Sequence, residues 1–111
     1  MTFKQDDEIT PVVFRCDRSG PFKNDVNAVF PCEPADYEGY KMTCYAHVGQ
    51  HSSCDQGWYN ATRAAKPEEY AVLKRELESA PYGYRFKVYA RIQPWMRAQR
   101  AAEAQCLRAC T

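Results

Sequence analysis

Two cysteines and two histidines lie close together near the middle of the chain. They form the pattern Cys44-x2-His47-x3-His51-x2-Cys54. Zinc in proteins prefers four cysteine or histidine ligands in tetrahedral geometry, so these residues are a candidate zinc site. If a strand continues through His47, however, the side chains of Cys44 and His47 point to opposite faces of the sheet. A zinc site here therefore requires the backbone to bend between those two residues.

The same segment allows other interpretations. Both histidines can hydrogen-bond within a Gly- and Ser-containing loop that forms part of an interaction surface, which is the interpretation we favour. A catalytic zinc held by His47, His51 and Cys54 would need a carboxylate as general base, and Asp55 is the only one nearby. A thiol–imidazole pair of Cys44 or Cys54 with His47 is a further enzymatic alternative. The chain has no G-x-S-x-G, H-E-x-x-H or phosphate-binding Gly-rich loop, so we predict no enzymatic activity and no required cofactor.

The chain has six cysteines, and an even number in a small protein suggests disulfides. The N-terminal residues include no apolar signal core, so we expect a cytoplasmic protein whose thiols are reduced. In that setting the cysteines are small buried apolar residues, and metal ligation by a subset is the alternative. The six are Cys16, Cys32, Cys44, Cys54, Cys106 and Cys110.

Hydrophobic periodicity and turn residues divide the chain into six expected elements in the order β-β-β-α-β-α. The strands are expected at residues 11–16, 25–30, 40–47 and 84–92, and the helices at residues 67–79 and 94–109. This order predicts an α+β fold, with a small antiparallel sheet of about four strands and two helices on one of its faces. We expect residues 1–10 to be flexible and residues 11–111 to form a single domain.

Three of these elements carry the clearest patterns. Helix 67–79 begins with Pro67, which suits the first helical position, although Lys66 is a poor cap. In strand 84–92, apolar side chains alternate with basic or aromatic ones. Helix 94–109 follows Gln93 and begins at a proline. The apolar side expected for this last helix comprises Trp95, Ala98, Ala102, Cys106 and Ala109.

If both helices cover one face of the sheet, the opposite face displays basic and tyrosine side chains. Such a face is typical of a solvated antiparallel sheet, of a protein contact, or of a surface that binds single-stranded nucleic acid through charge and stacking. We take a binding surface as the working hypothesis and add two aromatic residues from the neighbouring loop. Its predicted residues are Tyr45, Trp58, Tyr59, Arg85, Lys87, Tyr89 and Arg91.

Composition narrows the possible classes of protein. The 111 residues are 45% hydrophobic and 26% charged, which is typical of a folded globular domain rather than a disordered chain. No apolar run approaches the roughly 18 residues that a membrane-spanning helix needs. The net charge is +1, but it is unevenly placed: residues 84–111 sum to +5 and residues 1–83 to −4. This asymmetry favours an interaction surface in the C-terminal quarter of the chain.

Several short segments resemble a group of uncharacterised short proteins carried by bacteriophages and other bacterial mobile elements. The resemblance covers residues 12–92 and rests on residues 12–15, 28–31, 44–51, 67–79 and 84–88. It implies an accessory role in a phage or prophage, without implying a reaction or particular site residues. Small phage accessory proteins often act as inhibitors of host defence, including anti-CRISPR proteins, by occupying the surface of a partner.

Together these observations lead to one expected function and one alternative. We expect a non-enzymatic protein that binds and blocks a host protein or nucleoprotein complex, such as a CRISPR-type defence complex, in the bacterial cytoplasm and without a membrane partner. The alternative is a nucleic-acid-binding module stabilised by zinc at Cys44, His47, His51 and Cys54.

Overall fold

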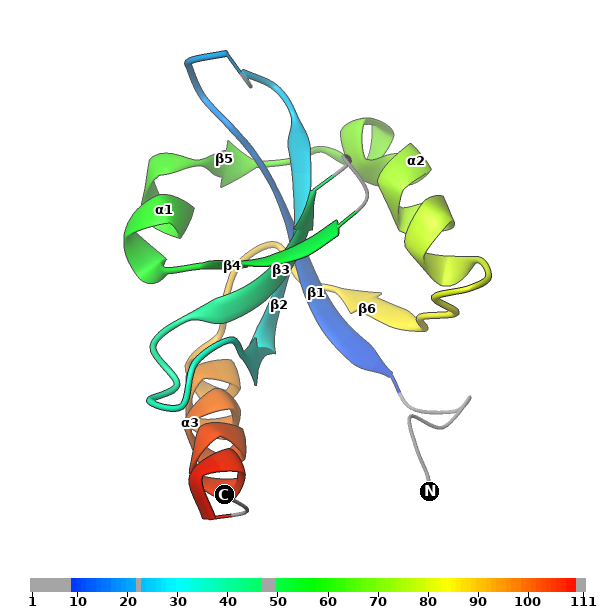
Figure 1. The fold of residues 1–111 in the computed structure, drawn as a ribbon. Coiled ribbons are helices and arrows are strands. Elements are labelled where there is room, and N and C mark those ends of the chain that lie inside the picture. Colours follow the sequence, from blue (N-terminus) through cyan, green and yellow to red (C-terminus); the bar gives the residue numbers. More distant parts are fainter. Residues whose placement is uncertain (1–8, 22, 47–49, 110–111) are drawn as a thin grey trace.

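The computed structural model describes residues 9–21, 23–46 and 50–109, which form an α+β fold (Figure 1). The class is as predicted, but this part of the chain has six strands and three helices rather than four and two. In chain order they are β1 (Thr10–Cys16), β2 (Val26–Pro34), β3 (Met42–Ala46), β4 (Gln50–Cys54), α1 (Gln56–Ala61), β5 (Arg63–Ala64), α2 (Pro67–Glu78), β6 (Phe86–Val88) and α3 (Pro94–Ala109). No helix among the described residues is long and apolar enough to cross a membrane.

The first four strands form an antiparallel meander, and the first three of them were predicted from the sequence. The strand order is β4-β3-β2-β1, and β5 continues the sheet antiparallel to β1. Val13 lies opposite Val29, and Val29 lies opposite Cys44, so one row of apolar side chains crosses three strands. The interval predicted as a polar loop contains β4 and α1 instead. The structure therefore corrects that prediction: Trp58 and Tyr59 lie on a helix.

The strand predicted at residues 84–92 is reduced to the three residues of β6, and it pairs with β1 in parallel. The sheet is therefore mixed rather than purely antiparallel. The physical reason is that β5 already pairs with the C-terminal half of β1, at Arg15 and Cys16, so only the segment around Thr10–Val12 is open to β6. The Tyr89 N–H still donates to the Val12 carbonyl at 2.9 Å, and after it the strand pairing and the predicted alternation end.

Side chains pack on both faces of the sheet, which overturns the prediction that both helices share one face. The α2-side core consists of Val12, Phe14, Ala28, Phe30, Tyr45, Leu73 and Leu77. The α1-side core consists of Val13, Val29, Met42, Cys44, Cys54 and Tyr59, with Tyr89 and Ile92 packed against it. Figure 1 shows α2 and α3 on opposite sides of the strands. The predicted solvent-facing sheet surface therefore does not exist as one face.

Helix α2 begins one residue after Lys66, as predicted, and the weak cap is compensated by Glu69. The Glu69 carboxylate accepts a hydrogen bond from the Lys66 backbone N–H at 2.8 Å and two from the Arg63 guanidinium at 2.9 and 2.7 Å. The hydrogen bonds from the Arg63 guanidinium have the largest effect on the pKa of Glu69. Together with the hydrogen bond from the Lys66 N–H, they lower it to about 2. The start of α2 is thereby joined to β5.

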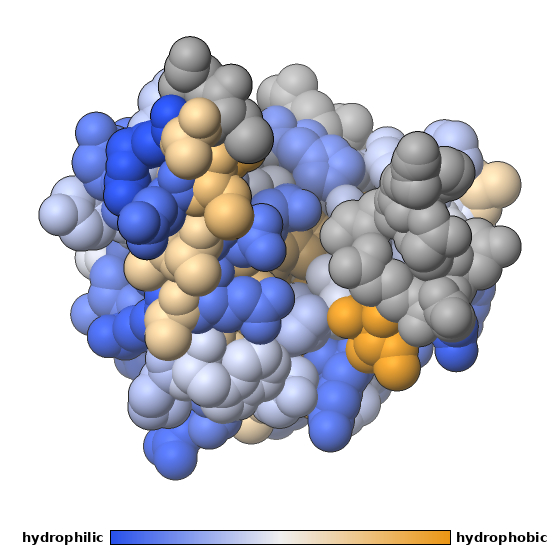
Figure 2. Space-filling model, turned by 90° about the horizontal axis from the view of Figure 1, so that it is seen from below, coloured by the Kyte–Doolittle hydropathy of each residue, from blue (hydrophilic) through white to orange (hydrophobic). Residues whose placement is uncertain are grey.

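Helix α3 packs with a different face from the one predicted. Its buried residues are Met96, Arg100 and Ala104, whereas the predicted apolar side, from Trp95 to Ala109, is exposed. Figure 2 shows this exposed apolar stripe along α3, bordered by hydrophilic atoms. The reason is polar: Arg100 donates to the carbonyl oxygens of Gly39 at 2.9 Å and of Pro31 at 2.8 Å. These two backbone acceptors orient the helix.

Candidate binding surface

The sheet separates the predicted zinc ligands. Cys44 lies opposite Ser52, and Tyr45 lies opposite His51 in the β3–β4 pairing. Because side chains alternate along a strand, Cys44 and Cys54 occupy the α1-side face and His51 occupies the α2-side face. His47 lies outside the described residues. Within the described ranges, no group of three or more Cys, His, Asp or Glu side chains is arranged to hold a metal ion.

His51 belongs to an aromatic cluster instead. Its ring lies 4.9 Å from that of Tyr45 and 5.9 Å from that of Tyr82, both edge-on, and it stacks on Phe30 at 6.1 Å. Its Nε2 lies 3.3 Å from the hydroxyl of Tyr84. The favoured interpretation placed this histidine in a loop; it lies instead on β4, and its hydrogen-bond partner Tyr84 is distant in the sequence.

Tyr45 is not a surface residue, which corrects its assignment to the binding surface. It is only 1% exposed, and its hydroxyl donates to the Glu76 carboxylate at 2.7 Å and lies 3.2 Å from the Tyr82 hydroxyl. These hydrogen bonds, to Tyr82 and to Glu76, raise its pKa, and burial adds to the effect. The Tyr45 side chain therefore connects β3 to α2 inside the protein and is not available to contact a partner.

Tyr59 is buried as well, and Trp58 is half-buried beside it on α1. The Tyr59 hydroxyl accepts a hydrogen bond from the Ile92 backbone N–H at 3.1 Å, and the Arg15 guanidinium lies 4.3 Å from the centre of its ring. Asp55 caps this short helix by accepting from the Trp58 N–H at 2.8 Å. Tyr59 therefore holds the segment before α3 in place, and its predicted role in the binding surface is wrong because the residue is buried.

Of the remaining predicted residues, three are exposed, and the fourth, Tyr89, is half-buried against the α1-side core. Arg85 and Lys87 are both exposed, because they alternate with the half-buried Phe86 on β6. The Lys87 ammonium lies 5.5 Å from the centre of the Tyr89 ring, within the range of a cation–π contact. Arg91 is exposed two residues further along the chain.

The structure adds two residues that sequence reasoning missed, Trp95 and Arg97. The Trp95 ring packs edge-on against Tyr89, with 5.8 Å between centroids, yet Trp95 stays 45% exposed. Arg97, also exposed, donates to Gln56 on α1 at 3.1 Å. The sequence analysis placed Trp95 on the apolar side of its helix and expected that side to be buried, which is wrong for this residue. We call the group Lys87, Tyr89, Arg91, Trp95 and Arg97 the Trp95 surface.

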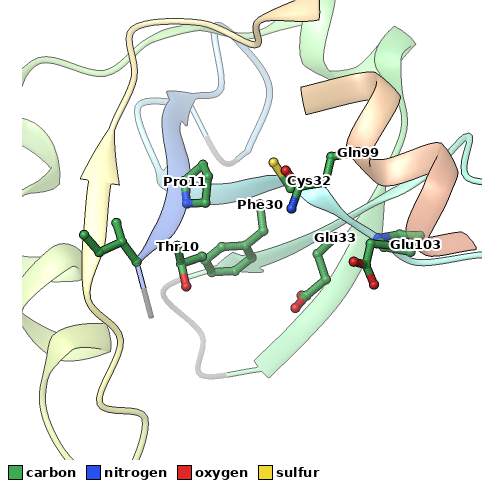
Figure 3. A pocket seen from close by; sticks show the side chains of 9 residues that line it. Thr10, Pro11, Phe30, Cys32, Glu33, Gln99 and Glu103 are labelled. Atoms are coloured by element: carbon green, nitrogen blue, oxygen red, sulfur yellow. The ribbon is translucent and has the colours of Figure 1, made fainter. Parts of the chain in front are cut away.

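A hollow of about 190 Å³ lies elsewhere, between the start of β1, the end of β2 and α3 (Figure 3). Glu33 and Glu103 stand on one side of it, and Cys32 lies at its wall. Burial raises the pKa of the Cys32 thiol. The two carboxylates make this hollow unsuited to an anionic ligand, in contrast to the Trp95 surface.

Comparisons with known proteins do not identify a function for the Trp95 surface. No family model, curated protein or solved structure matches the chain. The relation to proteins of phages and mobile elements therefore stays a prediction from the short segments named above.

Proposed function

We propose that the protein is a small non-enzymatic accessory protein of phages or mobile elements that binds a host macromolecular complex through the Trp95 surface. The observation that carries this proposal is the exposed Trp95 ring, which packs edge-on against Tyr89, whose own ring lies within cation–π range of the Lys87 ammonium. Arg91 and Arg97 add exposed positive charge in the same segment of the chain. Tryptophan, tyrosine and arginine are the residues most enriched at the energetic centres of protein interfaces.

The charge of this region favours an anionic partner. The C-terminal quarter of the chain has an excess of five positive charges, whereas the rest of the chain is net negative. Positive side chains on such a surface accelerate encounter with a negative one and disfavour basic partners. Together with the resemblance to phage proteins, this supports a nucleoprotein complex of host defence, such as a CRISPR-type complex in the bacterial cytoplasm, as the target to test.

The test is capture of purified bacterial nucleoprotein defence complexes by the tagged protein. We expect W95A to weaken capture by roughly thirtyfold or more, as for a central interface residue, and R91E to weaken it through charge. The matched control is Y40A, which removes a 74% exposed aromatic ring outside the Trp95 surface. Equal capture by wild type, W95A and R91E would remove this surface from consideration.

A second candidate, binding of single-stranded nucleic acid, is favoured by the same pairing of aromatic rings with cations. It predicts binding of a free oligonucleotide, with a slope of log K against log salt of about −2 if the three cations each contact one phosphate. Capture of the complex without oligonucleotide binding supports a protein contact instead. For the zinc-stabilised form of this candidate, metal analysis of protein purified without chelators must find about one zinc per chain.

A further inference from the structure

Cys44 and Cys54 form a pair of thiols on the α1-side face, at the edge of the sheet. They are diagonal neighbours: Cys44 lies opposite Ser52, and Cys54 lies two residues further along β4. Both cysteines belong to the α1-side core, and the Ser52 hydroxyl lies 3.3 Å from the Cys44 sulfur. Both cysteines are present as free thiols. The pairing of β3 with β4 therefore brings together two thiols that lie on different strands.

The pair is accessible to small molecules although each residue is mostly buried. Cys44 and Cys54 are 5% and 7% exposed, and both line a hollow of about 270 Å³. The hollow is also lined by Lys41, Asn27 and Trp58, and by one acidic residue, Asp55. A lysine and an asparagine can bind the carboxylates and peptide bonds of a small thiol peptide, and an aspartate can bind its ammonium group.

We propose that Cys44 and Cys54 are a redox-active dithiol that reduces a low-molecular-weight disulfide of the glutathione type and becomes an intramolecular disulfide. The Cys44 thiolate attacks one sulfur of the small disulfide, forms a mixed disulfide and releases one small thiolate. The Cys54 thiolate then attacks the Cys44 sulfur, closes the Cys44–Cys54 bond and releases the second small thiolate. Two protein thiols are oxidised, one small disulfide is reduced, and the two thiol protons go to the released thiolates.

The position of the pair explains these roles. The Ser52 hydroxyl is placed to donate to a Cys44 thiolate, which favours Cys44 as the attacking group. Diagonal strand neighbours lie about 7 Å apart between Cα atoms, slightly beyond the usual reach of a disulfide. Closure therefore draws the two strands together, and β4 can move because it is the outermost strand of the sheet.

Other described cysteines lack this arrangement. Cys16 donates weakly to the Glu69 carboxylate at 3.9 Å, and the pKa of its thiol is raised by burial and by that carboxylate. Cys106 is exposed on α3 and serves as an internal reference for general thiol reactivity. Cys110 lies outside the described residues.

The experiment treats the full reduced chain with oxidised glutathione, traps free thiols with a maleimide at intervals, and maps the linkages by peptide mass spectrometry. We expect a Cys44–Cys54 peptide pair lacking two hydrogen atoms to appear before Cys106 is modified. In C54S, the closing thiol is absent, so glutathione bound to Cys44 becomes the main product. C106S is the matched control and should leave the Cys44–Cys54 linkage unchanged.

Two further measurements keep the result specific. In urea the preference for the Cys44–Cys54 linkage should be lost, because only the fold brings the two thiols together. Circular dichroism checks that C54S retains the native fold, and the mapping of wild type does not depend on any variant. If wild type under native conditions forms other linkages first, or modifies Cys106 while Cys44 and Cys54 stay reduced, the proposal is wrong.

Discussion

Arg100 is the residue whose removal tests most directly how α3 is held against the sheet. Its side chain is 6% exposed and donates to the carbonyls of Pro31 and Gly39, which lie at the end of β2 and in the following loop. The substitution R100M keeps the length and the apolar stem of the side chain but removes both hydrogen bonds. It therefore isolates the polar contribution to the docking of this helix.

The expected magnitude follows from these two contacts. A hydrogen bond from a charged donor contributes about 1.5–3 kcal/mol, and two such bonds set the upper limit. Burial of the guanidinium opposes them, as the lowered pKa of Arg100 indicates, so part of the gain is offset. We expect R100M to reduce the free energy of unfolding by about 2–4 kcal/mol, a large share of the roughly 5–15 kcal/mol typical of a domain.

Urea unfolding followed by far-ultraviolet circular dichroism measures this change. R97M is the matched control, because Arg97 is exposed on the same helix and makes one hydrogen bond to Gln56. It should change the free energy of unfolding by no more than about 0.5 kcal/mol. If R100M is as stable as R97M, and hydrogen exchange shows α3 equally protected in both, the reasoning about Arg100 is refuted.

Three other substitutions test the packing around the sheet. G39A should destabilise by about 1–3 kcal/mol more than G20A, because both positions have φ near +80° but only at Gly39 does a Cβ meet Ala104, at 3.1 Å. Y45F should cost about 1.5–3 kcal/mol, since it removes the buried hydrogen bond from Tyr45 to a carboxylate on α2. E69Q should be less stable than wild type at neutral pH; because the folded pKa of Glu69 is about 2 against an ordinary 4.5, this difference should shrink as the pH falls from 4.5 toward 2.

Urea midpoints measure all three effects, the last one as a function of pH. Equal stability of G39A and G20A would show that the loop moves away from α3 without cost. An unchanged midpoint for Y45F would mean that the carboxylate finds another donor. A gap between wild type and E69Q that stays constant down to pH 2 would contradict the low pKa of Glu69.

Local patterns in the sequence identified the elements whose neighbours are close in the chain. The strands around Val13 and Val29, the helix after Pro67 and the helix after Pro94 were all found, because periodicity and turn residues act within a few positions. Strand β4 was missed because its residues, from Gln50 to Cys54, are mostly polar and resemble a loop. An edge strand with one solvent-facing side needs few apolar residues.

The candidate site was predicted less well, because burial decides which side chains a partner can reach. Tyr45 and Tyr59 have the residue type of interface groups, yet both hydroxyls are used inside the protein. Trp95 was placed on the buried side of its helix, because an apolar stripe normally faces the core. Here that stripe is exposed, and Arg100 occupies the buried side through its contacts with backbone carbonyls.

By itself the sequence determined the α+β class, the positions of most elements and the concentration of positive charge in the last quarter of the chain. These properties depend on composition and on short periodic patterns. Only the tertiary structure decided that the helices cover both faces of the sheet, that His51 is separated from Cys44 and Cys54, and that Trp95 lies beside Tyr89 at the surface. These depend on strand register and on the competition of β5 and β6 for one edge of β1, which are set by contacts between residues far apart in the chain.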